Sequence, residues 1–362
     1  MERHVGVLLC MLSFAACSSV GADPTGAGGA GGFLGSVGGT VGESGAGGIG
    51  GAMLHCGGVA GAIAAPVMFR EPSGNACSGA PMKMPRAGTS MGAATAADGR
   101  IYLVGGFALG AGNTDPACSG PRLIVYDPTT NAYRPLAEPP AQLSLGPTGA
   151  TIVGDTLFVL AGQLLRYDIP TDTWSVPTQI ARDGAWTYGD PLPGPNGSVY
   201  LFGAEDGTKT YEYSPSADRY HELPRMPDTI FFPTAATLGG KYYAISSYGS
   251  AVFDPQAQTW RPITGPSYRN GASAISDGAG HLLYIGGEST VIESMVQSYD
   301  PATDAWTLAP SLPVGMVSPA LASGCGGRVF AFGGQNRDYA HYPTGQTDLV
   351  QVYGAGAWTL SP

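Results

Sequence analysis

The sequence predicts an all-β fold made of a repeated unit of four short strands. Glycine and proline account for 57 and 30 of the 362 residues, while only 12% are charged, a composition typical of short strands joined by turns. A motif of an aromatic residue, a turn and a second aromatic residue recurs along the chain, as in YDPATDAW at Tyr299–Trp306. Self-similarity with a period of roughly 40 to 55 residues predicts an array of like units.

The elements of each unit follow in a fixed order. A segment of small residues, such as GAATAADG from Gly92, predicts the first strand. An apolar run that ends in glycine, such as IYLVGG at residues 101–106, predicts the second strand. The aromatic motif supplies the third and fourth strands, because its proline presets the backbone of the turn between them. The second aromatic residue of each motif counts six units: Tyr133, Trp174, Tyr220, Trp260, Trp306 and Trp358.

Glycines after the second strand, followed by Tyr and Trp at this spacing, resemble the kelch repeat, over about residues 85–362. The resemblance implies a six-bladed β-propeller of the galactose oxidase-like type, in which four-stranded blades surround an axis. First strands made of small residues fit the crowded axis. The two motif aromatics are expected to pack against the neighbouring blade and to supply most of its buried apolar area.

Three units depart from this pattern. Unit 3 has three prolines within residues 186–197, so its first strand should be short, because a central strand tolerates proline badly. Unit 4 has Ser246 and Ser247 where Gly-Gly belongs. Unit 6 lacks the Asp-Pro turn and already contains its own outer strand. We therefore expect residues 77–85 to close the ring, without an exchange of terminal strands.

Residues 1–16 are typical of a lipoprotein signal peptide. Their apolar run is shorter than the roughly 20 residues that a membrane-spanning helix needs. FAAC at residues 14–17 resembles a bacterial lipobox in which Cys17 is lipidated, although Phe replaces the usual Leu. With Ser18 after the cysteine, the resemblance implies an outer-membrane or cell-surface lipoprotein of a Gram-negative bacterium. Cleavage after residues 20–22 is the alternative, and would give a free periplasmic or secreted protein.

The chain divides into three predicted regions. The signal peptide, residues 1–16, is followed by a glycine-rich segment at residues 17–76. Such a segment buries too little apolar surface to offset its ordering entropy, so we interpret it as a flexible tether. The predicted six-bladed propeller occupies residues 77–362.

Cysteine content favours disulfides in the exported protein. After signal cleavage and lipidation at Cys17, an even number of cysteines remains: Cys56, Cys77, Cys118 and Cys325. Four cysteines allow three pairings, and buried free thiols are the alternative. Cys77 and Cys118 are both expected beside blade 1 on one face, so we prefer their pairing. The second predicted disulfide is then Cys56–Cys325.

Charge excludes one class of partner. The formal net charge is −10, and no segment is rich in Lys and Arg, so nucleic acid is not an expected partner. We expect a monomer that binds a protein or a glycan.

The candidate binding site is a rim of loops on one face of the ring. The long loops between second and third strands lie at residues 107–122, 287–297 and 334–348, in the adjacent blades 5, 6 and 1, whereas those of blades 2 and 4 are minimal. The candidate rim residues come from these loops and from the connections between blades: Arg86, Arg182, Asp183, Trp186, Tyr268, Arg269, Asn270, Glu288, Arg337 and His341.

Three of these residues are arginines that open alternate blades: Arg86, Arg182 and Arg269. Three guanidinium groups around one mouth could receive a carboxylate or a polar glycan. Arginines of kelch-like repeats also have a structural role, in which they bond neighbouring carbonyl groups. Both roles remain open.

Some kelch-like propellers are copper radical oxidases with two histidine ligands. The histidines of the mature chain are His55, His221, His281 and His341. We place His221 on an outer strand and His281 in a turn on the opposite face, so only His341 reaches the rim. Two imidazoles cannot meet there, and we expect neither a metal nor a cofactor.

A second resemblance is to a periplasmic six-bladed propeller that interconverts sialic acid anomers. A sugar-acid isomerase of this kind needs a carboxylate beside arginines for proton transfer. The candidate carboxylates are Asp183, Glu205, Glu288 and Glu293. The sequence favours an exported binding module on a tethered stalk, with the isomerase as the alternative.

Overall fold

The computed structural model describes residues 83–85, 87–106, 122–140, 148–178, 190–204, 208–227, 230, 233–336 and 346–360. By its internal contacts the chain divides into residues 1–55 and residues 56–362, and every described residue belongs to the second unit. The predicted signal peptide and tether therefore lie outside the described residues. No helix in the described ranges is long and apolar enough to cross a membrane.

The described residues form six four-stranded antiparallel sheets, each made of four consecutive strands. Blade 1 contains β1 (Gly92–Thr95), β2 (Ile101–Val104), β3 (Leu123–Asp127) and β4 (Ala132–Pro135). Blade 2 contains β5 (Gly149–Val153), β6 (Thr156–Leu160), β7 (Leu164–Asp168) and β8 (Thr173–Ser175). Blade 3 contains β9 (Leu192–Pro193), β10 (Val199–Ala204), β11 (Lys209–Ser214) and β12 (Arg219–Leu223), with a 3-10 turn at Pro195–Gly197.

The second half of the ring repeats this order. Blade 4 contains β13 (Thr234–Leu238), β14 (Lys241–Ser246), β15 (Gly249–Asp254) and β16 (Thr259–Ile263). Blade 5 contains β17 (Ser273–Ser276), β18 (Leu282–Ile285), β19 (Val296–Asp300) and β20 (Ala305–Ala309). Blade 6 contains β21 (Ala320–Gly324), β22 (Arg328–Phe332), β23 (Val350–Gly354) and β24 (Ala357–Leu360), with a 3-10 turn at Cys325–Gly327.

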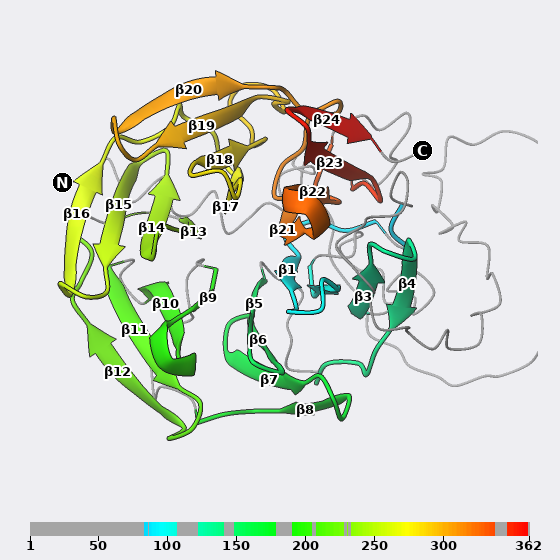
Figure 1. The fold of residues 1–362 in the computed structure, drawn as a ribbon, viewed down its shortest axis with the longest axis vertical. Coiled ribbons are helices and arrows are strands. Elements are labelled where there is room, and N and C mark those ends of the chain that lie inside the picture. Colours follow the sequence, from blue (N-terminus) through cyan, green and yellow to red (C-terminus); the bar gives the residue numbers. More distant parts are fainter. Residues whose placement is uncertain are drawn as a thin grey trace, which may run out of the picture. The chain divides into compact units, whose positions relative to one another are not determined.

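The six blades close into a ring (Figure 1). The first strand of each blade lies inside the ring and the fourth lies outside. Neighbouring first strands contact one another in the order β1, β5, β9, β13, β17, β21 and back to β1. The predicted fold class, an all-β six-bladed propeller, is thus confirmed for the described residues.

The repeated motif builds the turn between third and fourth strands, which we call the outer turn. In blade 5, Tyr299 on β19 lies directly opposite Trp306 on β20. Asp304 adopts a positive φ of 52°, and Tyr299 Oη donates a 2.6 Å hydrogen bond to its carboxylate. An aspartate tolerates this left-handed conformation better than most residues, which explains the acidic residue at this position.

The motif also joins each blade to the one before it. The Asp304 carboxylate accepts a 3.1 Å hydrogen bond from the backbone N–H of Thr264, at the end of blade 4. Trp306 Nε1 donates a 2.8 Å hydrogen bond to the Thr264 carbonyl. Tyr299 and Trp306 pack in one apolar cluster with Tyr243 and Ile245 of blade 4. The predicted packing between blades is confirmed here, and a polar link accompanies it.

Ring closure uses the residues that precede blade 1. The Met84 N–H donates a 2.8 Å hydrogen bond to the Asp348 carbonyl of blade 6. The Met84 side chain packs with Phe330 and Phe332 of blade 6 and with Tyr126 of blade 1. The described end of the predicted closing segment, residues 77–85, therefore lies between the last blade and the first.

Blade 3 confirms the expected short first strand. Strand β9 has two residues, Leu192 and Pro193. Asp190, just before it, strengthens this weak point, because its carboxylate accepts hydrogen bonds from Thr234 Oγ1 at 3.1 Å and from the Ala235 N–H at 3.3 Å. A side chain thus supplies a link to blade 4 at the weak first strand.

Candidate functional site

Two kinds of loop meet on one face of the ring, which we call the rim face. They are the loops between second and third strands and the connections from one blade to the next. Asn270, in the connection from blade 4 to blade 5, pairs with Glu288, in the β18–β19 loop. Each residue donates its N–H to the carbonyl of the other at 2.8 Å. The fold therefore places two predicted rim residues side by side.

Two tyrosines stand next to this pair. Tyr248 and Tyr268 are 47% and 50% exposed. Their hydroxyl oxygens are 3.1 Å apart, and their rings pack edge to face with centroids separated by 5.5 Å. Asn270 Nδ2 donates a 3.0 Å hydrogen bond to Tyr268 Oη. We call Tyr248, Tyr268, Asn270 and Glu288 the rim patch.

The hydrogen bond between the two hydroxyl groups stabilises the neutral form of Tyr248. The hydrogen bond with Tyr268, and then partial burial, raise the pKa of Tyr248 to about 12. The patch therefore offers two aromatic rings whose hydroxyl groups already bond within the protein. Ordering these rings on binding costs little additional entropy.

The serines that replace Gly-Gly in unit 4 place Tyr248 in the patch. Ser246 Oγ accepts a 3.2 Å hydrogen bond from the Tyr248 N–H, which shapes the tight β14–β15 hairpin. Ser247 Oγ donates a 3.0 Å hydrogen bond to the carbonyl of Arg269. That bond ties the hairpin to the connection that carries Tyr268. Sequence reasoning passed over Tyr248 because its loop is minimal, although the serine substitution was a visible signal.

Arg269 lies beneath the rim patch. Its side chain is only 2% exposed. Nη1 donates hydrogen bonds to the carbonyls of Gly286 at 2.9 Å and Met295 at 2.7 Å, and Nη2 donates one to Gln297 Oε1 at 2.9 Å. The guanidinium also lies 4.8 Å from the centroid of the Tyr284 ring. The sequence left two roles open for Arg269, ligand binding and structural support. These contacts fit the structural role.

Burial of Arg269 has an electrostatic cost. Desolvation lowers the pKa of its guanidinium from the ordinary value, and electrostatic interactions with Tyr284 and Glu293 partly offset this. The cost is tolerated because the guanidinium bonds carbonyl groups at both ends of the β18–β19 loop. Arg269 therefore holds the loop that carries Glu288 and does not reach a ligand at the surface.

The other predicted rim residues lie outside the described residues: Arg86, Arg182, Asp183, Trp186, Arg337 and His341. The same holds for Glu205, Cys17, Cys56, Cys77 and Cys118. Only the backbone of Cys325 is described, so the disulfides stay predictions. Glu293 lies in the β18–β19 loop, where it accepts a 2.6 Å hydrogen bond from Ser289 Oγ.

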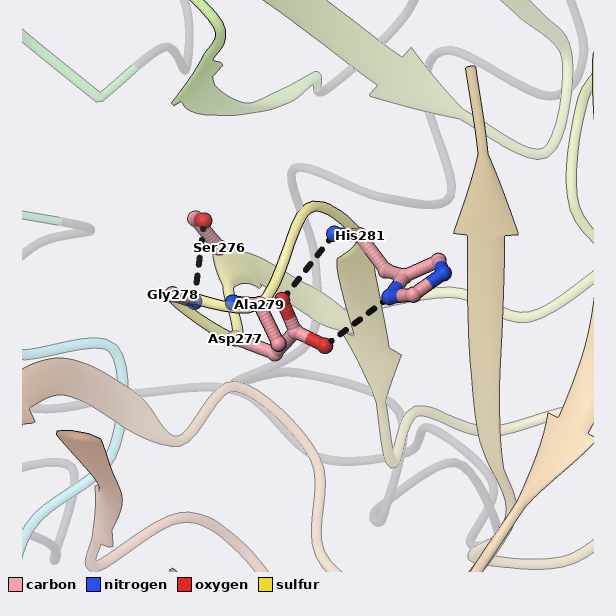
Figure 2. Close-up of polar contacts among 5 residues, drawn as sticks. All are labelled: Ser276, Asp277, Gly278, Ala279 and His281. Carbon is pink, nitrogen blue, oxygen red and sulfur yellow. Dashed lines mark hydrogen bonds and ion pairs between the residues drawn. The ribbon is translucent and has the colours of Figure 1, made fainter. Parts of the chain in front are cut away.

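His281 lies at the opposite end of β18 from the rim patch, as expected. Figure 2 shows it in the β17–β18 hairpin, where its Nδ1 is 3.2 Å from Asp277 Oδ2. Asp277 Oδ1 accepts hydrogen bonds from the N–H groups of Ala279 at 2.7 Å and His281 at 3.0 Å. This carboxylate therefore shapes the hairpin. His221 lies on the outermost strand β12, also as expected.

Side chains that could bind a metal are dispersed over the described part of the chain. Within those ranges, no three His, Cys, Asp or Glu side chains gather in a way that could hold a metal ion.

Comparisons with known proteins agree with this architecture. A family model described as Kelch motif matches residues 88–140. Kelch-like protein 21 of Homo sapiens is 26% identical over 146 residues, which are 37% of this chain and 24% of that protein. Kelch-like protein 35 of Mus musculus is 22% identical over 232 residues, or 58% of this chain and 38% of that protein. The chain thus spans well under half the length of these curated relatives.

A solved structure, titled "Structure of YjhT", covers 78% of this chain and 99% of its own, with a TM-score of 0.59 and 12% identity. At this identity the likeness concerns the fold alone. The chain is a six-bladed β-propeller. One of its repeats, at residues 88–140, matches the Kelch motif.

Proposed function

We propose that this propeller is a protein-binding module and that the rim patch is its binding surface. A propeller with kelch-type repeats supports a protein-binding role. The observation that carries the proposal is the half-exposed Tyr248–Tyr268 pair, held in place by Asn270. Tyrosine is enriched among the residues that dominate protein interfaces.

The geometry of the pair suits this role. An edge-to-face contact and a shared hydrogen bond hold both rings before any partner arrives. Pre-ordered aromatic groups bind with a smaller loss of conformational entropy than mobile side chains do. Both rings keep about half of their surface for a partner.

A protein partner is favoured over an anionic glycan or a sugar acid. Both of those ligands would draw on the predicted arginines, and the guanidinium of Arg269 is occupied inside blade 5. The same burial removes one of the arginines that the isomerase alternative would place beside a carboxylate. Glycan binding and isomerase activity are kept as outcomes of the test.

The test is a selection of displayed random peptides on the purified propeller, with a glycan array and a sialic acid mutarotation assay in parallel. Tyr248→Ala/Tyr268→Ala is the test variant. Leu308→Ser is the matched control, because Leu308 is 76% exposed on the outer strand β20. We expect peptides that bind the wild type and the control but lose at least tenfold in affinity on the double variant.

The proposal would fail if every selected peptide bound the double variant as well as the wild type. It would also fail if the tyrosine substitutions changed only glycan binding or mutarotation.

We also propose that the module is exported and lipidated at Cys17. The support is the sequence pattern of residues 1–17 alone. Metabolic labelling of the expressing bacterium with an alkyne fatty acid should mark the wild type and leave Cys17→Ser unlabelled. Equal labelling of both proteins would refute the lipid anchor.

A further inference from the structure

We infer that this chain pairs with a second copy of itself through the outer edge of blade 5, strand β20. The inference goes beyond the proposed function, because β20 lies on the outside of the ring (Figure 1) and has no residue in the rim patch. Among the described residues, β20 has a hydrogen-bonded strand, β19, on one side only. A strand with one open side presents backbone N–H and C=O groups that can pair with another strand.

The outward-facing groups of β20 can be identified from the other blades. Pro135 in β4 and Pro262 in β16 each lie two residues after the second aromatic residue of the motif. A proline has no N–H to donate to the third strand, so the backbone at this position faces outward. The equivalent residue of blade 5 is Leu308, two residues after Trp306. Because every second residue of an antiparallel strand faces the same way, the N–H and C=O groups of Trp306 and Leu308 point away from β19.

Four of the outer strands carry features that oppose strand pairing, and β20 carries none of them. Strands β4 and β16 each contain an arginine followed by a proline. Strand β12 contains Arg219, His221 and Glu222, and β8 has only three residues. Proline, charge and short length are the usual protections of a sheet edge. Strand β20, with the sequence AWTLA, has five residues without a charge or a proline.

Strand β24 of blade 6 also lacks charge and proline within its four residues. We choose β20 because it is longer and more exposed. Leu308 is 76% exposed, whereas its equivalent on β24, Leu360, is 39% exposed. Trp306 is partly exposed, whereas its equivalent, Trp358, is only 8% exposed. Strand β20 therefore offers more surface to a neighbouring strand.

The occupant is a second copy because β20 is complementary to itself. When two β20 strands pair antiparallel with Thr307 opposite Thr307 of the second copy, Trp306 of each copy lies opposite Leu308 of the other. Both Trp306–Leu308 pairs then exchange both backbone hydrogen bonds, since these residues face outward. Opposed threonines, and an aromatic residue opposite an apolar one, favour antiparallel pairing, and no like charges meet. One surface patch used by both copies gives a closed two-fold dimer.

The test is analytical ultracentrifugation of the full-length chain with Cys17→Ser under reducing conditions, so that neither lipid nor disulfides join the copies. We expect a reversible dimer with a Kd below about 1 mM. Because each copy has a formal net charge of −10, added salt should strengthen the dimer by screening the repulsion. Hydrogen exchange at the N–H groups of Trp306 and Leu308 should slow as the protein concentration rises.

Three variants separate the outward N–H from other effects. Leu308→Pro removes this donor and should weaken the dimer at least tenfold. It should still fold, because Pro135 and Pro262 occupy the same position, and urea unfolding checks this. Leu308→Ser loses the same side chain but keeps the N–H, and should weaken the dimer by less than about fivefold. Glu222→Pro is the matched control, because it makes the same change at the equivalent position of β12 and should leave the dimer unchanged.

Each outcome decides for or against the second copy. A chain that stays monomeric at about 1 mM, as the sequence alone predicts, would overturn the inference. A dimer that Leu308→Pro does not weaken, or that protects amides outside β20, would also overturn it. If the chain is monomeric but displayed peptides bind the wild type and not Leu308→Pro, the edge accepts a foreign strand instead. None of these results depends on Tyr248 or Tyr268, so the proposed function stands or fails separately.

Discussion

Tyr299 in the outer turn of blade 5 and Tyr268 in the rim patch both have a hydrogen-bonded hydroxyl, yet the first is 0% exposed and the second is 50% exposed. Tyr299 belongs to the repeated motif and packs against the preceding blade. Tyr268 belongs to a connection that is not repeated. The difference teaches that the repeated tyrosines maintain the ring, whereas an unrepeated tyrosine is available to a partner.

The strongest test of this comparison is to remove the aromatic ring of Tyr299 and that of Tyr268 in separate variants. Tyr299→Ala should lower the free energy of unfolding by about 3 to 5 kcal/mol, because it leaves a cavity between blades 4 and 5. Tyr268→Ala should lower it by less than about 1 kcal/mol, because the ring is half exposed. Urea unfolding of both variants measures the two losses. Equal losses would mean that exposure does not separate the two roles.

Arg269 shows that the rim patch depends on a buried support. Arg269→Ala should lower the free energy of unfolding by about 3 kcal/mol, since it removes the guanidinium hydrogen bonds to the carbonyls of Gly286 and Met295 and leaves a cavity beneath the rim patch. Arg269→Lys should restore less than half of this, because an ammonium group cannot reproduce the planar guanidinium. Chemical denaturation gives both values. Full rescue by lysine would show that charge alone is needed.

The polar link between blades is expected to contribute less to the free energy of unfolding than Arg269 does. Asp304→Ala should cost about 2 kcal/mol, because Tyr299 Oη and the Thr264 N–H both lose their acceptor. Asp304→Asn keeps an acceptor oxygen and should cost less than about 1 kcal/mol. Thermal or urea denaturation of this pair of variants is the measurement. Similar losses in both would assign the effect to the carboxylate charge.

The pH dependence of stability should have opposite signs at two aspartates. Hydrogen bonds from Tyr213 and then Thr178 lower the pKa of Asp218, so its contribution is present above the ordinary value near 4 and is lost as pH falls through the lowered pKa. Desolvation raises the pKa of Asp190, despite hydrogen bonds from Ala235 and Thr234. Its folded state prefers the protonated form, so stability falls as pH rises from about 4 through the raised pKa.

Two neutral variants measure these signs. Asp218→Asn should flatten the loss of stability in acid. Asp190→Asn should gain stability relative to the wild type as pH rises, by about 1.4 kcal/mol for each unit of the raised pKa. The check is a series of urea unfolding curves between about pH 3 and about pH 8, which bracket the ordinary carboxyl range. Parallel curves for Asp190→Asn and the wild type would contradict the desolvation argument.

Much of the fold could be predicted because the motif acts locally. The number of blades could be predicted from Trp306 and its equivalents, because each outer turn needs its own pair of aromatic residues. The prolines around Leu192 predicted the short first strand of blade 3, because proline removes a backbone donor. Asp304 was visible as a turn residue, but its link to Thr264 of the preceding blade was not.

The candidate site could be predicted only in part. Tyr268 and Asn270 were found because they lie in a connection between blades, and Glu288 because it lies in a long loop between second and third strands. Tyr248 was missed because loop length was taken as the signal, and its loop is minimal. Its place in the patch depends on the bond from Ser247 to the Arg269 carbonyl, which joins two segments that are distant in sequence.

By itself, the sequence determined the number of blades, the order of their strands and the position of the shortest first strand, in blade 3. These features follow from turn geometry and from burial that repeats with the motif. Only the tertiary structure decided that Arg269 points inward while Tyr268 stays at the surface. The reason is physical: the carbonyls of Gly286 and Met295 that hold the guanidinium are brought to it by blade 5. Which side chain a loop exposes therefore depends on acceptors that another segment provides.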